Sequence, residues 1–382
     1  MARLLTGWLA IAALSMPLMA FAADNVNLPK TITSTSHAPG SAGHSQTVAI
    51  GNLLQNEYGT SVRIMPSSND VAFMNLVRSG RVELCTCPSA AYFAQEGVLM
   101  FSGPEWGPQQ LRVLAMSVAN VGMGMVAAGD VGITEPADLK GKRVASIRGG
   151  DSQNLGAEAV LAFGGLTWDD VERVEFPSYI KTLEGILNDQ VDAAFVMTIT
   201  STTQQIASSS RGIKWPYMDP NDEEAWARAQ DVAPYLQPKK VTLGAGISKE
   251  EPWHGSSYPY PIILGSDSLD YELASSMIRV LIEDYDLYKD SAPGTSGYAL
   301  ENQNLTWVMP FHQAVVDYYK ERGAWTDEMQ ANQDHLLERE TVLQQAWKDY
   351  VGSTDAEGDA FKSGWMKARA TALESAGFKA VF

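Results

Sequence analysis

The sequence has little cysteine and little positive charge. Only two of its 382 residues are cysteine, so disulfides cannot staple the fold and each domain must depend on its hydrophobic core. The chain carries 28 lysines and arginines against 45 aspartates and glutamates, a net charge of −17. A polyanionic partner needs a basic surface, so this balance argues against binding to nucleic acid and against docking on anionic lipid.

The common motifs of nucleotide-dependent and hydrolytic enzymes are also missing. The sequence has no GxGxxG after a strand, no P-loop, no HExxH and no GxSxG. Its five histidines are not grouped with a serine and an acid in any recognisable pattern. We therefore expect neither enzymatic activity nor a cofactor.

Long hydrophobic runs are missing everywhere except at the N-terminus. Arg3 precedes an almost uncharged stretch over Leu4–Phe21, and Ala20 and Ala22 are the small residues that signal peptidase accepts. This pattern predicts a cleaved secretory signal over residues 1–22; the alternative is an uncleaved N-terminal anchor. No cysteine follows the apolar stretch, so a lipid anchor is not indicated. The mature protein is expected outside the cytoplasm.

The remaining composition is that of a globular protein, with 45% hydrophobic and 19% charged residues. The length predicts two domains. Short apolar strands alternate with helical patterns between residues 30 and 265, which predicts an α/β fold with mostly parallel sheets. The expected strands lie at 31–34, 61–65, 82–86, 111–117, 122–128, 144–147, 171–176, 193–197 and 261–264. The chain after Pro234 reads as loop, and the last expected helices lie at 271–288, 310–322, 327–351 and 355–376.

Small polar residues follow the predicted strands in both units. Ligands of open α/β sheets bind beyond the carboxyl ends of the strands, so these residues are candidates for binding a small polar solute. The alternative for each of them is an ordinary helix N-cap. The candidates are Ser36, His37, Ser41, His44, Ser68, Asn69, Thr86, Ser89, Tyr92, Arg148, Asp151, Ser152, Gln153, Asn154, Thr198 and Thr200.

The only two cysteines stand close together as Cys85-Thr86-Cys87. Alternate residues of a strand face the same side, so both sulfurs should project together. With His37 and His44 at the end of a neighbouring strand, they could bind a metal ion or a metal chelate. The alternative is a pair of core residues, reduced or oxidised to a disulfide. Binding of a metal or chelate is the second functional hypothesis.

Several phrases of the chain resemble the TAXI family of periplasmic solute receptors, which serve TRAP-type transporters. The resemblance covers about residues 31–324 and is carried by an ordered series of segments. They are Thr31-Ile32-Thr33, Gly40-Ser41-Ala42-Gly43, Asn75-Leu76-Val77-Arg78-Ser79-Gly80, Asp138-Leu139-Lys140-Gly141-Lys142-Arg143-Val144, Gly149-Gly150-Asp151-Ser152, Gln190-Val191-Asp192-Ala193-Ala194-Phe195, Pro310-Phe311-His312 and Tyr318-Tyr319-Lys320-Glu321-Arg322-Gly323. Two loops depart from it: His44-Ser45-Gln46 stands where the family usually has a tyrosine pair, and Cys85-Thr86-Cys87-Pro88 replaces the usual third loop.

The resemblance implies the two-lobed fold of a periplasmic binding protein, with each lobe a mostly parallel sheet flanked by helices. Lobe I would comprise residues 23–120 and 257–326, and lobe II residues 121–256, joined by a hinge. Residues 327–382 would form a helical extension on lobe I, for which the family suggests no role. The implied partners are a small organic acid or amino acid and the membrane subunits of a TRAP-type transporter.

Arg148 is the strongest candidate for anchoring a carboxylate solute, because its planar guanidinium can pair with both carboxylate oxygens. In the alternative interpretation Arg148 pairs with Asp151, three residues further on. Asp151 could instead contact an ammonium group of the solute, which would favour an amino acid.

Overall fold

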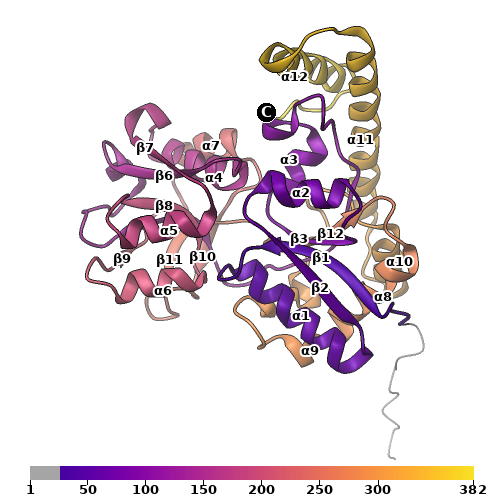
Figure 1. The fold of residues 1–382 in the computed structure, drawn as a ribbon, viewed down its shortest axis with the longest axis horizontal. Helices are drawn as coiled ribbons and strands as arrows, with labels where there is room; N and C mark the ends of the chain where they lie inside the picture. Colours follow the sequence, from indigo (N-terminus) through magenta and orange to yellow (C-terminus); the bar gives the residue numbers. More distant parts are fainter. Residues whose placement is uncertain (1–25) are drawn as a thin grey trace, which may run out of the picture.

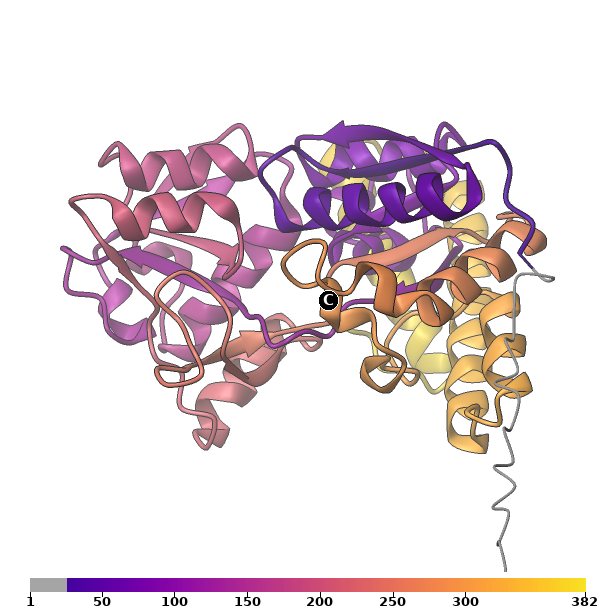
Figure 2. The ribbon, with the colours of Figure 1, turned by 90° about the horizontal axis from the view of Figure 1, so that it is seen from below.

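A computed structural model describes residues 26–382. The expected signal segment, residues 1–22, lies outside the described residues. The chain forms two α/β lobes that lie side by side, with a helical C-terminal extension on one of them (Figures 1 and 2). This confirms the two-lobed α/β fold expected from the sequence. No helix within residues 26–382 combines the length and the apolar character that crossing a bilayer requires.

Lobe I is built on a five-stranded sheet. In spatial order its strands are β2 (Ser61–Ser67), β1 (Thr31–His37), β3 (Leu84–Cys87), β12 (Ile262–Ser266) and β4 (Leu111–Met116). The first three run parallel, and β12 is antiparallel to both of its neighbours. The sheet is therefore mostly parallel, with one strand contributed by a distant part of the sequence.

Helices cover both faces of this sheet. One face carries α1 and α8, and the opposite face carries α2 and α3 (Figure 1). Helix α1 begins at Ser41, whose Oγ accepts a hydrogen bond from the His44 amide at 3.2 Å, and it ends at Gly59 in the left-handed conformation. The helical elements of this lobe are α1 (Ala42–Tyr58), α2 (Asp70–Arg78), α3 (Ala90–Glu96), η1 (Leu99–Phe101), α8 (Tyr271–Glu283), α9 (Tyr285–Tyr288), η4 (Thr295–Tyr298), η5 (Leu300–Asn302) and α10 (Gln313–Glu321).

Lobe II repeats this plan on a second five-stranded sheet. Its strands, in spatial order, are β7 (Glu172–Phe176), β6 (Arg143–Ile147), β8 (Ala193–Met197), β5 (Met123–Ala128) and β9 (Ile213–Lys214). Here β5 is the antiparallel strand. The helical elements are η2 (Pro136–Leu139), α4 (Asp151–Phe163), η3 (Trp168–Asp170), α5 (Tyr179–Leu187), α6 (Ser201–Ser208) and α7 (Glu223–Val232).

The chain crosses between the two sheets twice. The first crossing lies between Met116 and Met123, and the second between Ser257 and Ile262. The two segments run side by side, because the Tyr260 amide donates to the Ser117 carbonyl at 2.8 Å and the Ser117 amide donates to the Pro261 carbonyl at 3.0 Å. This pair of hydrogen-bonded crossings connects the two lobes.

One stretch of the sequence was interpreted wrongly. The chain after Pro234 was expected to be loop, but it forms an antiparallel pair, β10 (Gln237–Val241) and β11 (Trp253–Ser257). Their sequences have a weak strand signal, because β10 contains Pro238 and two lysines, and β11 contains His254 and Gly255. The pairing between them, and the packing of Trp253 in the core of lobe II, override those weak local preferences.

The C-terminal extension consists of two helices, α11 (Asp327–Ser353) and α12 (Gly358–Ser375), which pack against each other and on α3 (Figure 1). Trp365 in α12 is completely buried and donates its indole N–H to the Gly97 carbonyl at 2.6 Å. The C-terminal Phe382 packs its ring 5.5 Å from that of Phe93 and 5.8 Å from that of Tyr92. The extension therefore supports one helix of lobe I.

Buried ion pairs fix this support. Glu96, at the end of α3, receives the Arg339 guanidinium of α11 through both carboxylate oxygens, at 2.8 and 2.7 Å. Arg369 of α12 also donates to Glu96, and its own side chain is fully buried. Removing one partner from such a buried group leaves charge without compensation, which costs more than the loss of an exposed ion pair.

We expect Arg369→Met to lower the free energy of unfolding by about 3 kcal/mol, because a buried charged network loses one of its partners. Lys367→Met is the matched control, since Lys367 is exposed on the same helix, and it should change stability by less than about 0.5 kcal/mol. Urea unfolding of the two variants measures the difference. Equal stability would show that the ion pairs contribute nothing to anchoring the extension.

Candidate functional site

Two carboxylates connect the lobes in a reciprocal way. Asp70, the first residue of α2 in lobe I, accepts a hydrogen bond from the Ser152 amide in lobe II at 2.6 Å. Asp151, beside Ser152 in the first turn of α4, accepts from the Met100 amide of lobe I at 2.7 Å. Helix α4 has no side-chain N-cap from its own lobe. Asp70 therefore supplies from lobe I an acceptor for a free N-terminal amide of a lobe II helix.

Asp70 is the most unusual ionisable group at this interface. Its side chain is fully buried, and its second oxygen, Oδ1, has no hydrogen-bond partner in the described residues. Burial raises the pKa of Asp70 to about 7, although the hydrogen bond from Ser152 opposes the shift. Burial also raises the pKa of Asp151. No ion pair found within residues 26–382 includes either of these carboxylates.

A row of aromatic rings continues from these carboxylates. Tyr258, on the second crossing, packs edge to face against Tyr235 of lobe II with ring centroids 5.2 Å apart, and its other side meets Tyr260 at 6.0 Å. Tyr235 also meets Tyr92 of α3, with centroids 6.4 Å apart. These rings make the core of lobe I continuous with part of the core of lobe II.

Hydroxyl groups in this row lack partners in the same way as Asp70. The buried oxygens of Ser89, Ser152, Tyr235 and Tyr258 make no hydrogen bond of normal geometry in the part of the chain that the structure describes. The Ser89 hydroxyl lies near those of Tyr235 and Tyr258, and the Ser152 hydroxyl lies near Asp70, so these groups are at most weakly paired with one another. We call Asp70, Ser89, Ser152, Tyr235 and Tyr258 the interlobe cluster. Buried polar atoms are normally satisfied, so several of them together at a lobe interface indicate a site for a polar ligand.

Members of the interlobe cluster lie close enough to influence one another. Burial raises the pKa of the Tyr258 and Tyr235 hydroxyls, the neighbouring Ser89 hydroxyl opposes this, and the Asp70 carboxylate adds to it. Asp70 also adds to the raised pKa of Tyr260, after burial and the other tyrosines. These phenols are therefore neutral at physiological pH, and they can donate or accept hydrogen bonds.

His37 borders the same interface at the end of β1. It is buried against Phe73, Tyr179 and Tyr260, with ring centroids 5.0, 5.7 and 6.5 Å away. Burial lowers the pKa of His37 to about 4, so the imidazole is neutral at pH 7. Tyr179 belongs to lobe II, where its hydroxyl lies 2.8 Å from the Thr200 hydroxyl. His37 therefore brings polar and apolar surface to the interface but no positive charge.

A glycine makes the approach of Tyr260 possible. A Cβ atom on Gly43, in the first turn of α1, would lie 2.8 Å from the Tyr260 hydroxyl oxygen. That separation is too short for a carbon and an oxygen that are not bonded, so a side chain at Gly43 would displace the Tyr260 ring. This gives one physical reason for a glycine-rich loop after β1.

Part of the candidate set from the sequence does meet where the lobes join. Ser89 and Ser152 belong to the interlobe cluster, and Asp151 makes the reciprocal contact. Asn69 caps α2 and lies next to Gly149 of lobe II. The candidates brought to the interface are His37, Ser41, Asn69, Ser89, Tyr92, Asp151, Ser152 and Thr200.

Arg148, expected to anchor a carboxylate, is not brought into the interlobe cluster. Its side chain is 79% exposed, and it pairs with Glu175 of the neighbouring strand at 2.7 Å. The alternative pairing with Asp151 does not form either, since Asp151 accepts from Met100. Glu175, which lies opposite Ser146 in the parallel strand β7, is a partner that local sequence spacing could not reveal.

Other candidates satisfy local structure. Asn154 forms two hydrogen bonds with the backbone of Ile147, and Thr198 bonds to Gly122 and Leu243 near the first crossing. Thr86 faces a small void under α1, away from the cysteines. Ser36 and His44 contact each other, with Oγ and Nδ1 3.1 Å apart. Ser68 is exposed, and the buried Gln153 lies beside Gly150.

The structure does not support the hypothesis that Cys85, Cys87, His37 and His44 bind a metal ion or a metal chelate. Cys85 and Cys87 are joined by a disulfide, so neither sulfur is a free thiolate ligand. His37 lies among aromatic rings, and His44 faces Ser36. Within residues 26–382, no three side chains of histidine, cysteine, aspartate or glutamate gather in a way that could hold a metal ion. The close pair of cysteines is a buried covalent link inside β3.

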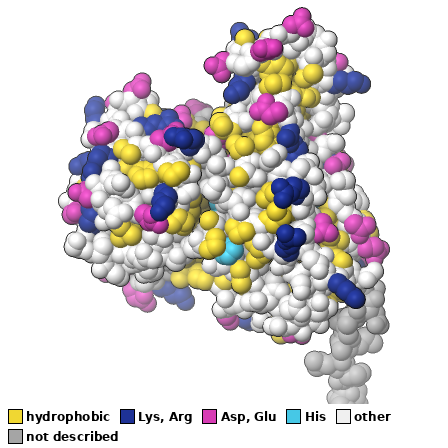
Figure 3. Space-filling view, viewed as in Figure 1, with side chains coloured by type: hydrophobic (Ala, Val, Ile, Leu, Met, Phe, Trp, Pro, Cys, Tyr) yellow, Lys and Arg dark blue, Asp and Glu magenta, His cyan; other side chains and the backbone are white. Residues whose placement is uncertain are grey.

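The lobes also face each other across an open cavity of about 420 Å³. Lobe I contributes Gly40, Ser41, Ala42, Ser45 and Pro293, and lobe II contributes Ile199, Ser201, Gln204, Leu243 and Gly244. The Ser201 hydroxyl donates to the Gly40 carbonyl at 2.9 Å across it. Figure 3 shows hydrophobic side chains and a histidine along the junction of the lobes on one face. This cavity therefore lies between the two lobes.

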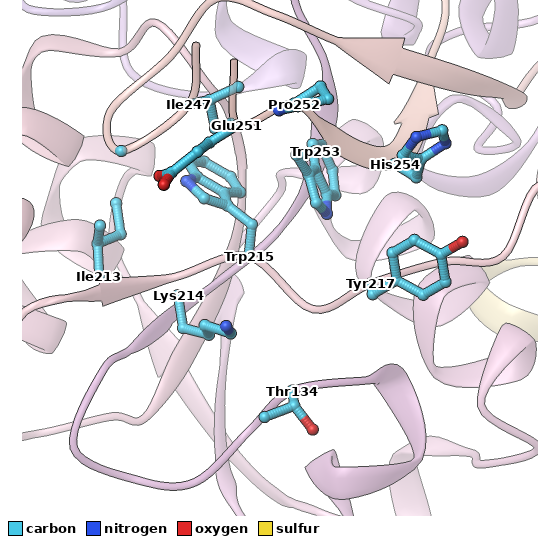
Figure 4. Close-up of a pocket in the computed structure, with 11 residues that line it drawn as sticks. Thr134, Ile213, Lys214, Trp215, Tyr217, Ile247, Glu251, Pro252, Trp253 and His254 are labelled. Carbon is cyan, nitrogen blue, oxygen red and sulfur yellow. The ribbon is translucent and has the colours of Figure 1, made fainter. Parts of the chain in front are cut away.

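A second cavity, of about 460 Å³, belongs to lobe II alone (Figure 4). Its walls include Trp215, Tyr217, Trp253 and His254, with Lys214 and Glu251 at its edge. The two indole N–H groups already donate to backbone carbonyls of Ala245 and Pro216. This cavity shows no unpartnered buried polar atom, so the interlobe cluster is the stronger candidate site.

Sequence reasoning missed three members of the interlobe cluster. Asp70 follows Asn69 in a polar loop that was recognised, but it was not among the candidate residues. Tyr235 and Tyr258 lie in the stretch after α7 that was interpreted as loop. A possible signal was the density of aromatic residues in Tyr258-Pro259-Tyr260, directly before the strand that returns to lobe I.

Comparisons with known proteins give one family match and several similar solved structures. Residues 39–323 match the NMT1-like family. Among solved structures, a protein from Bordetella bronchiseptica RB50 is 14% identical, with a TM-score of 0.44 over 71% of this chain and 77% of that one. The periplasmic aliphatic sulphonate binding protein SsuA from Escherichia coli is 15% identical, with a TM-score of 0.41 over 80% and 97% of the two chains. An ancestral arginine-binding protein bound to arginine is 14% identical, with a TM-score of 0.41 over 70% and 100%.

The raised pKa of Asp70 predicts that closure of the ligand-free protein depends on pH. With the lobes in contact, as in this structure, the pKa of Asp70 is about 7; we call this the closed form. In an open form, with the lobes separated, Asp70 would be exposed to water and would titrate near its ordinary value of 3.8. The ratio of closed to open molecules should therefore fall about tenfold per pH unit between about 4 and 7, then level off. Small-angle scattering should show wild-type protein more open at pH 8 than at pH 5.

Asp70→Asn should remove most of this dependence and stay closed at pH 8, because the amide can still accept from Ser152 without carrying charge. Asp151 also has a raised pKa, and it makes the reciprocal contact between the lobes with the Met100 amide. Asp151→Asn is therefore the companion variant. A scattering profile of Asp70→Asn that changes with pH as much as that of the wild type would disprove the role of Asp70.

Proposed function

Because the chain belongs to the NMT1-like family and folds as two lobes that meet at a polar cluster, we propose that it is an extracytoplasmic solute receptor. It captures a small polar solute, an organic acid or amino acid, between the lobes. The observation that carries this proposal is the interlobe cluster. Its five buried side chains each leave a polar atom without a partner within the described residues.

The physical mechanism is closure around the solute. In an open form, rotation about the paired crossings would expose the Asp70 and Ser89 side of lobe I and the Ser152 and Tyr235 side of lobe II. Solute bound to one lobe would supply the missing hydrogen bonds of the other, and so stabilise the closed form. The receptor performs no chemical reaction on the solute.

Delivery to a TRAP-type membrane transporter is the finer part of the proposal, and it is supported by the resemblance to TAXI receptors. The expected signal over residues 1–22 would place the mature protein in the periplasm. There the closed surface of the two lobes would dock on the membrane subunits, which would supply the energy of transport.

A screen by thermal shift followed by small-angle scattering tests the receptor function. Purified protein is screened against a library of organic acids and amino acids. We expect at least one compound to raise the melting temperature and to reduce the radius of gyration, without being consumed. A library without any compound that does both would contradict a receptor for this class of solute.

The hydroxyl of Tyr258 provides a sharper test of the site. Tyr258→Phe should weaken binding of the best compound by about tenfold, because one hydrogen bond to solute is lost. The ligand-free protein should lose little stability, since that hydroxyl makes no hydrogen bond of normal geometry and only lies near Ser89. Isothermal titration calorimetry measures the affinity.

Tyr318→Phe is the matched control. The Tyr318 hydroxyl is also buried without a partner among the described residues, but Tyr318 lies in α10, on the edge of lobe I. Its removal should leave affinity unchanged within twofold. If both variants bind as tightly as the wild type, the solute does not contact Tyr258.

A further inference from the structure

The interlobe cluster has negative charge and no positive charge. Asp70 is fully buried and is absent from the ion pairs of the described residues. The charged side chain that shifts its pKa is that of Asp151, which is also acidic. His37 borders the site as a neutral imidazole. The arginine expected to enter the site, Arg148, points to Glu175 instead.

A buried carboxylate without a counter-charge is costly, and there are three ways to reduce the cost. The group can take up a proton, the lobes can separate and admit water, or a cation can enter. The first two do not use the other members of the cluster. A cation that enters between the lobes would lie next to Asp70 Oδ1, the oxygen that has no partner within residues 26–382.

The aromatic rings of the lobe interface favour the same kind of group. Tyr92, Tyr235, Tyr258 and Tyr260 form a connected row, with neighbouring centroids between 5.2 and 6.4 Å apart. The negative faces of such rings attract ammonium groups, most strongly where water is excluded. The free hydroxyls of Ser89 and Ser152 can serve the remaining polar atoms of a solute as donors or acceptors.

We propose that the interlobe cluster is a subsite for a cationic nitrogen, and that the solute carries an ammonium group paired with Asp70 Oδ1 and flanked by Tyr235 and Tyr258. This inference rests on the proposed receptor function and deepens it. Among small polar solutes it selects amino acids and organic amines, and it excludes organic acids that lack a nitrogen. A carboxylate solute would be paired with an arginine; here Asp70 is the charged partner, and it pairs with a cationic solute instead.

Matched pairs of compounds test the subsite. Each amino acid is compared with its des-amino carboxylic acid, and choline with its uncharged isostere 3,3-dimethylbutanol, by thermal shift at pH 8 and then by calorimetry. We expect a nitrogen-bearing member to bind and its partner to bind at least about 30-fold more weakly, as for the loss of a charge-assisted hydrogen bond.

Two variants assign the effect to Asp70. Asp70→Asn should weaken binding of the nitrogen compound at least about 30-fold while keeping the bond from Ser152, so the fold is retained. Asp290→Asn, at an exposed position of lobe I, should bind as the wild type does. Wild-type affinity should also rise from pH 5 to pH 8 as Asp70 loses its proton, and Asp70→Asn should lose that rise. Asp151→Asn separates the contribution of the second carboxylate, while His37 and the tyrosines stay neutral over this range.

The outcomes distinguish the inference from the function on which it rests. If acids without nitrogen bind and close the protein, and Asp70→Asn does not weaken them, the cationic subsite is overturned and the receptor function stands. If no compound of either class raises the melting temperature or closes the protein, the receptor function fails and the subsite fails with it.

Discussion

The arrangement of the two lobes depends on one carboxylate that is buried without a counter-charge. The Asp70 side chain of lobe I accepts a hydrogen bond from the Ser152 amide of lobe II, at the start of α4. Helix α4 has no side-chain cap from its own lobe. The contact satisfies one Asp70 oxygen and leaves the other unpartnered. Closure without solute is therefore held by hydrogen bonds and opposed by desolvation of a charge. The proposed receptor function requires such a balance, because an empty closed form that is too stable would not admit its solute.

The crossings make this balance possible because they carry part of the site themselves. Tyr258 and Tyr260 lie between β11 and β12, on the segment that would bend as the lobes separate. Their rings join the cores of both lobes in the closed form. Movement of the lobes would therefore change the surroundings of Tyr258 and Tyr235 directly, so that binding and closure involve the same side chains.

The sequence predicted the fold better than the site. Strands such as β6 and β8 are short apolar runs bounded by turns, and those local signals were sufficient. Several of the polar residues after the strands also lie where the lobes meet. The role of each candidate residue depended on its distance in space from other residues, which the spacing along the sequence does not encode. Arg148 pairs with Glu175 across a parallel pair of strands. Asp70 gained its role from a helix 82 residues further along the chain.

The C-terminal extension bears on the site through α3. This short helix begins just after Ser89, carries Tyr92 and ends at Glu96, so its two ends face the interlobe cluster and the extension respectively. Arg339 and Arg369 fix Glu96, Trp365 binds the Gly97 carbonyl, and Phe382 packs on Tyr92. A seven-residue helix has little stability of its own. Its position, and with it the position of Ser89, is therefore set by helices that begin more than two hundred residues later. The sequence analysis suggested no role for the C-terminal extension; in the structure it supports α3, which forms one wall of the candidate site.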